Sequence, residues 1–130
     1  MTPAREALEL ARVVTEAADS VKAIDIKTID VTGRLALTDL FVVASGGSER
    51  QVDAIVDRIE ERITTRNVKP RREGQAGARW VLLDLGDVVV HVFHADDRAF
   101  YSLEGLWRDC PEIDPLEALG QDRALAAVGE

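Results

Sequence analysis

The sequence holds few histidine and cysteine side chains that could bind a metal ion. His91 and His94 are its only histidines, and Asp96 and Asp97 follow closely, so the four could be read as a ligand set. Both histidines lie in an apolar segment typical of a strand, and positions three apart in a strand point to opposite faces. We therefore expect no metal site. His91 is predicted to be a partly buried, hydrogen-bonded imidazole, and His94 to be exposed at the strand's end.

A nucleophilic site is equally hard to assemble. The single cysteine, Cys110, stands beside Pro111 near the predicted end of a helix, and it has no second cysteine for a disulfide. The serines nearest to a helix start, Ser45 and Ser48, do not form a triad with either histidine. These features predict a protein that is not an enzyme and that uses no cofactor.

One loop leaves a catalytic alternative open. Gly46-Gly47-Ser48 carries the chain from an apolar run into a helical pattern, as does the entry motif of nucleotidyltransferases, and helix amides favour anions. The loop lacks the spacing and the lysine of a P-loop. Such enzymes also need two carboxylates on one strand face to hold metal ions, and neither Asp53 with Asp57 nor Asp84 with Asp87 meets that need. A nucleotidyltransferase-like enzyme using this loop is therefore the alternative.

The hydrophobic patterns predict the elements that position these residues. They indicate a helix starting at Thr2-Pro3, strands over 24–31 and 40–44, a helix after the capping box of Ser48 and Gln51, a loop over 67–77 that could hold a short strand, a hairpin over 80–94 turning at Gly86-Asp87, and a helix over 95–107. The alternation changes parity near Lys27 and Thr28, which predicts a bulge. This order is typical of an α/β (or mixed α+β) single domain, with a mixed sheet of four or five strands and flanking helices. We expect the domain to span residues 1–109, and residues 110–130 to form a tail that is partly helical or disordered.

Composition limits the functional classes. The net charge of −8 disfavours nucleic acid as the main partner and suits a basic protein partner. The N-terminal residues do not resemble a secretory signal, so we expect a cytoplasmic protein.

The helix predicted over 95–107 has two faces. Phe100, Leu103 and Trp107 share one helical face that fits packing on the sheet. Tyr101 and Glu104 lie on another face, with Arg98 nearby, and an aromatic side chain among charges is typical of a protein-binding hot spot.

Four sequence blocks together resemble the ribosomal silencing factor, or Iojap-like, family. They are TDLFVVASGGSERQ (38–51), Glu73-Gly74, WVLLDLGDVVVHVF (80–93) and the RxFYxLExLW pattern of residues 98–107. The similarity spans roughly residues 8–107.

The resemblance implies a nucleotidyltransferase-like topology without catalytic activity. It also implies a protein that binds the large ribosomal subunit through large-subunit ribosomal protein fourteen at the intersubunit face, and blocks joining of the small subunit when nutrients are scarce. Homodimers are known in the family, and a dimeric adaptor without a ribosomal role is a further alternative. The matched blocks suggest six polar or aromatic contributors to partner binding: Trp80, Asp84, His91, Arg98, Tyr101 and Glu104. Whether Trp80 and Trp107 belong to the core or to the interface stays open at this level.

Overall fold

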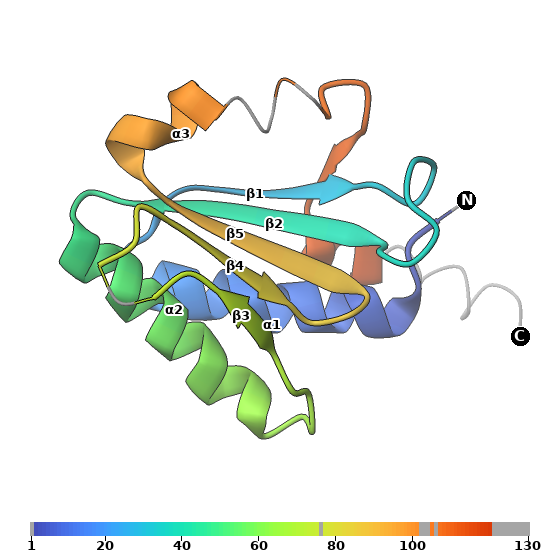
Figure 1. Ribbon diagram of the computed structural model, residues 1–130. Helices are drawn as coiled ribbons and strands as arrows, with labels where there is room; N and C mark the ends of the chain where they lie inside the picture. The colour runs from blue at the N-terminus through green and yellow to red at the C-terminus, as the bar shows by residue number, and fades with distance from the viewer. Residues whose placement is uncertain (1, 76, 102–104, 106, 121–130) are drawn as a thin grey trace, which may run out of the picture.

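The computed structural model describes residues 2–75, 77–101, 105 and 107–120, without the side chains of residues 99–101. It shows one mixed sheet with helices on both faces (Figure 1). The described elements, in chain order, are α1 (Arg5–Ser20), β1 (Ile24–Asp30), β2 (Leu40–Gly46), α2 (Glu49–Thr64), β3 (Arg71–Glu73), β4 (Trp80–Asp84), β5 (Val88–His94), α3 (Ala95–Tyr101) and β6 (Glu112–Ile113). The predicted α/β class is confirmed. No helix in this described part of the chain is long and apolar enough to span a membrane.

The sheet has six strands in the order β3-β4-β5-β2-β1-β6. We expected four or five strands, and the difference comes from the short edge strands β3 and β6. At the centre, β2 and β5 run parallel, from the pair Leu40–Val88 to the pair Gly46–His94. Every residue of β2 is buried, because helices cover one face of the sheet and aromatic side chains cover the other.

Helices α1 and α2 pack side by side on one face of the sheet (Figure 1). Their apolar stripes bury residues such as Val14, Ile55 and Ile59 against Val42 and Val90 of the central strands. The predicted start of the first helix is corrected slightly. Helix α1 begins at Arg5 without a side-chain cap. The amide of Ala4 instead donates to Asp39 Oδ2 at 2.8 Å.

The capping box at the start of α2 is confirmed, with one addition. Ser48 Oγ accepts from the Gln51 amide at 3.1 Å, as the pattern predicts. Gln51 Oε1 accepts from the Gly47 amide at 2.6 Å, and Gln51 Nε2 donates to the carbonyls of Val21 and Lys22 at 3.3 and 2.9 Å. One glutamine side chain therefore joins the end of α1 to the start of α2.

The predicted bulge in the first strand and the predicted hairpin are both present. The register between β1 and β2 shifts between Ile24 and Lys27, where Asp25 has a φ of 49°. In the hairpin, the Leu85 amide donates to the Val88 carbonyl at 2.9 Å, which leaves Gly86 and Asp87 as the turn. Gly86 has a φ of 88°, which glycine adopts without steric cost.

The chain beyond residue 109 does not begin as a separate tail, which corrects the expected boundary. Strand β6 pairs with β1 through Ile113 and Glu112. Residues 115–120 are helical, as expected, and Leu119 is only 2% exposed within the main core. Backbone pairing and apolar burial thus tie residues 112–119 to the domain.

Candidate functional site

The face of the sheet opposite α1 and α2 carries three of the six partner residues predicted from the sequence: Trp80, Asp84 and His91. On β4, Trp80, Leu82 and Asp84 alternate onto this face, opposite Phe93, His91 and Val89 of β5. We call the side chains of Trp80, Leu82, Asp84, His91 and Phe93 the Trp80 face. Leu82 and Asp84 are half-buried, and Trp80 is 36% exposed. An aromatic side chain on an incompletely covered sheet is a surface that a partner can bury.

Two contacts hold the indole of Trp80. Its ring stacks on Phe93 with a centroid separation of 5.1 Å and an interplanar angle of 27°. Its Nε1 donates to His91 Nδ1 at 3.3 Å. Trp80 therefore belongs to both categories that the sequence left open, because one side of it packs on the core and the other is accessible.

His91 lies beneath this indole and is only 4% exposed. Burial lowers the pKa of His91 to about 4, so the imidazole is neutral near pH 7. The ring of Phe41 meets it edge-on at 5.0 Å. His91 was expected to be partly buried and hydrogen-bonded; the hydrogen bond at Nδ1 is confirmed, and the ring is more deeply buried than expected. His91 is itself buried, and it contacts the Trp80 face by accepting a hydrogen bond from the indole of Trp80.

Arg98 faces the protein interior on one side. Its Nη1 donates to Ser45 Oγ at 2.8 Å and to the Ile24 carbonyl at 3.3 Å. These bonds tie α3 to β2 and β1. Among the other predicted contributors, Asp84 accepts from the Gly86 amide at 2.9 Å. The side chain of Tyr101 and the whole of Glu104 lie outside the described residues.

Trp107 differs from Trp80 in its surroundings. It is partly buried, and it meets Phe41 edge-on with centroids 5.1 Å apart. The guanidinium carbon of Arg34 lies 5.7 Å from the centroid of the Trp107 ring, within the range of a cation–π contact. Trp107 therefore packs on a smaller group of buried side chains that includes Ile29 of β1 and Phe41 of β2. Trp80, in contrast, borders solvent over β4.

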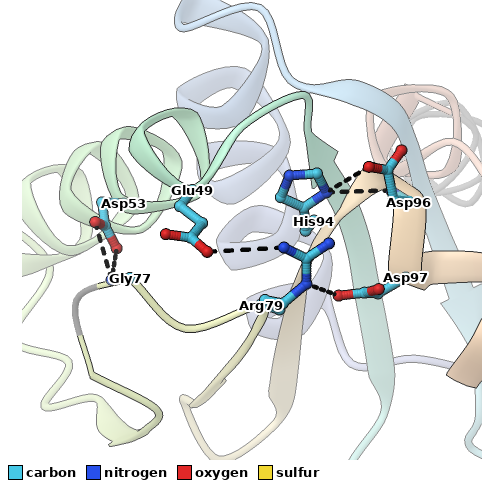
Figure 2. A network of polar contacts seen from close by, with 7 residues as sticks. All are labelled: Glu49, Asp53, Gly77, Arg79, His94, Asp96 and Asp97. Carbon is cyan, nitrogen blue, oxygen red and sulfur yellow. Dashed lines mark hydrogen bonds and ion pairs between the residues drawn. The ribbon is translucent and has the colours of Figure 1, made fainter.

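The Gly46–Ser48 loop lies at the carboxyl ends of the parallel strands β2 and β5, where α/β folds often bind ligands. Here the Gly47 amide already donates to the Gln51 side chain, and the Gln51 amide donates to the Ser48 side chain. The side chains around this end include Glu49, Asp96 and Asp97, with Arg79 among them (Figure 2). Carboxylates near the loop repel phosphate, so the arrangement disfavours a nucleotide in this place.

The two histidines lie on opposite faces of β5, as the alternation predicted. His91 pairs with Leu82 on the Trp80 face, whereas His94 lies at the end of the strand beside Gly46. His94 was expected to be exposed, and that expectation is wrong: it is 9% exposed, and its Nδ1 accepts from the Asp96 amide at 3.2 Å as α3 begins. Within the described ranges, no three histidine, cysteine or acidic side chains are grouped as metal ligands.

Sequence reasoning missed Arg79. Its guanidinium pairs with Glu49 of α2 at 3.7 Å and makes a close ion pair with Asp97 of α3 (Figure 2). The hydrogen bond to Asp97, more than any other contact, raises the pKa of Arg79 above its usual value. Three elements distant in sequence meet at this one side chain, and no local pattern or spacing could have indicated that.

The chain is similar in sequence to proteins of one known family. The chain matches the family described as "Ribosomal silencing factor during starvation" over residues 4–128. It is 42% identical to a ribosomal silencing factor RsfS of Halalkalibacterium halodurans over 107 residues, covering 82% of this chain and 92% of that protein. It is also 42% identical to the Bacillus subtilis protein of the same name, covering 79% of this chain and 88% of that one.

More distant relatives and solved structures extend this picture. The chain is 35% identical to the chloroplastic protein Iojap of Arabidopsis thaliana over 125 residues, covering 90% of this chain and 48% of that protein. A crystal structure from Bacillus halodurans superposes with a TM-score of 0.73 at 41% identity, covering 82% of this chain and 97% of that chain. The similarity spans nearly all of the described domain, at identities well above those that show a fold alone. The chain belongs to the ribosomal silencing factor family.

Proposed function

We propose that this protein binds the large ribosomal subunit through large-subunit ribosomal protein fourteen at the intersubunit face, and that it sterically blocks joining of the small subunit. Its effect is to lower translation in the cytoplasm when nutrients are limited. Family membership supports the ribosomal role. The Trp80 face supports a binding surface for a protein partner.

The observation that carries the proposal is the exposed, oriented indole of Trp80. Tryptophan is enriched at interface hot spots because it buries a large area at a small entropic cost. Phe93 and His91 already hold this ring, so little further ordering is needed on binding. Asp84 at the other end of β4 and the overall charge of −8 suit a basic partner.

Steric exclusion is sufficient as the mechanism. A domain of this length is about 30 Å across by the usual scaling of compact proteins. Bound at the interface between two subunits, an object of that size keeps them apart without any catalytic step. The six predicted contributors divide accordingly. Trp80 and Asp84 would face the partner, and His91 would support Trp80 from below. Arg98 would hold α3 on β1 and β2. Tyr101 and Glu104 remain proposed contacts from the sequence pattern.

Sedimentation of purified large subunits with this protein tests the proposal. The wild type should comigrate with the large subunit and reduce subunit joining. Trp80→Ala should weaken binding at least tenfold, as expected for a hot-spot side chain. Leu116→Ala is the matched control, because Leu116 is also a large exposed apolar side chain, at 62% exposure, and lies outside the Trp80 face.

The contrary results are clear. Absence of the wild-type protein from the large-subunit fraction, or subunit joining at its normal rate, would refute the proposed function. Equal losses for Trp80→Ala and Leu116→Ala would remove the Trp80 face as the binding surface.

We also propose that the protein is a homodimer when free and that it has no catalytic activity. Light scattering on the wild type and on Trp80→Ala would show whether self-association uses the Trp80 face. The hydrogen-bonded amides of Gly47 and Gln51 support the absence of nucleotide chemistry. Calorimetry with nucleotide and magnesium should show no heat of binding, and a signal that is lost in Ser48→Ala would contradict this.

A further inference from the structure

We propose that Arg79 is a positioning residue for the partner surface. Its guanidinium clamps the first turns of α2 and α3 to the start of β4, and this clamp orients the next residue, Trp80. The expected effect on partner binding rests on the proposed function. The effect of Arg79 on the orientation of Trp80 can be tested without ribosomes.

The clamp is a single cation between two carboxylates from different helices (Figure 2). Arg79 Nε donates to Asp97 Oδ2 of α3, and Nη1 lies 3.7 Å from Glu49 Oε1 of α2. The Arg79 carbonyl accepts from the His94 amide at 2.8 Å, in the last residue of β5. Backbone and side chain of Arg79 thus connect three elements immediately before Trp80.

The loop leading to Arg79 is attached at a second point. The Gly77 amide donates to both carboxylate oxygens of Asp53 at 3.2 Å, and Gly77 has a φ of 82° (Figure 2). Asp53 lies one turn after Glu49 on α2. The chain entering β4 is therefore held against one helix at two positions two residues apart.

The clamp lies at the end of β4 where its pairing with β3 has ended. Strand β3 pairs with β4 from Asp84 to Leu82 and stops there. At Trp80, β4 pairs with Phe93 of β5. The ion pairs of Arg79 lie where the ladder with β3 has ended, so they add constraints at the start of β4.

The clamp is expected to affect orientation more than stability. The Arg79 side chain is 44% exposed and the Asp97 side chain 24%, and ion pairs in contact with solvent add little to the free energy of folding. Binding is more sensitive than folding to the loss of the clamp, because binding requires the Trp80 ring to be held in one orientation. Loss of the clamp should therefore weaken binding while the fold persists.

The test uses the full chain with 5-fluorotryptophan, followed by fluorine NMR and by large-subunit sedimentation. The sequence has two tryptophans, so two resonances are expected, and Trp80→Phe assigns them. Arg79→Met keeps the length of the side chain and removes its charge, and Asp97→Asn removes the charge of its partner. Arg50→Met is the matched control, because Arg50 is an exposed arginine in the same turn of α2 as Glu49.

In Arg79→Met and in Asp97→Asn, the Trp80 resonance should shift or broaden while the Trp107 resonance stays unchanged. Large-subunit binding should weaken about tenfold in each variant, and the double variant should bind no more weakly than Arg79→Met, because Arg79→Met already removes the contact with Asp97. Arg79→Lys should bind the large subunit with an affinity between those of the wild type and Arg79→Met. Arg50→Met should match the wild type in both measurements.

A Trp80 resonance identical to the wild type in both clamp variants would overturn the proposal, as would undiminished binding or fully additive losses. A change in both tryptophan resonances would also overturn it, because that indicates a general loss of structure. If the wild type itself fails to bind the large subunit, the proposed function fails, and the Trp80 resonance still decides whether Arg79 positions that ring.

Discussion

Trp80 Nε1 donates to His91 Nδ1 at 3.3 Å, across the antiparallel pair β4–β5. This bond joins a surface indole to a buried imidazole. It also determines the tautomer of His91, because an Nδ1 that accepts leaves the proton of the neutral ring on Nε2. The surface and the core beneath it are therefore coupled through one hydrogen bond.

Trp80→Phe should separate the hydrogen bond from the stacking. A phenyl ring can still stack on Phe93, but His91 Nδ1 loses its donor in a buried position. We expect the free energy of unfolding to fall by about 1 kcal/mol, the usual net value of one such bond. Urea denaturation at pH 7 measures this, and a variant as stable as the wild type would show that the bond contributes nothing.

Stability should depend on pH through His91. Its pKa is about 4 in the folded protein and about 6.5 when unfolded, so the unfolded state binds the extra proton between these values. Stability is therefore complete above about pH 6.5 and declines as the pH falls through this window toward 4. The loss due to this group is about 2–3 kcal/mol at pH 4.5.

Carboxylates also titrate in this range, so the measurement is a difference between two proteins. Urea denaturation of the wild type and of His91→Gln at pH 7 and at pH 4.5 gives the part that belongs to His91. His91→Gln should lose less stability than the wild type over this interval. Equal losses in both proteins would contradict the lowered pKa.

The two glycines before α2 should respond differently to alanine. A Cβ on Gly46 would lie 2.8 Å from the Val52 amide nitrogen, whereas one on Gly47 would have Gln51 Oε1 as its nearest neighbour, at 3.4 Å. We expect Gly46→Ala to reduce the free energy of unfolding by about 1–3 kcal/mol, as overpacking does, and Gly47→Ala to change it much less. Thermal melting of the pair tests this, and the reverse order would be inconsistent with the packing described.

Residues beyond 109 should contribute to folding. Leu116 and Leu119 lie three positions apart in the helical segment 115–120. Leu119 is 2% exposed, whereas Leu116 is 62% exposed. Leu119→Ala should cost about 2–3 kcal/mol by creating a cavity, and Leu116→Ala should stay within about 0.5 kcal/mol of the wild type. Chemical denaturation compares the two variants. Similar, small effects in both would mean that residues 112–119 behave as a tail after all.

Local patterns in the sequence predicted most of the elements correctly. The capping box of Ser48, the turn at Gly86 and the parity change in the first strand each depend on residues within a few positions of one another, and each is present. The opposite orientation of His91 and His94 follows from strand alternation alone. The burial of His94 could not be predicted in this way, because it depends on the packing of α3 against the ends of β5 and β2.

The partner residues show the same division. The sequence by itself determined the family, the α/β class and the aromatic character of the strand and helix around residues 80–107, since these depend on residue types and their order. Only the tertiary structure decided that Arg98 bonds inward to Ser45, that Trp80 borders solvent while Trp107 packs on Phe41, and that Arg79 joins three elements. The physical reason is that burial and ion pairing depend on which distant segments meet, and that information lies in the packing of the sheet and its helices rather than in any local spacing.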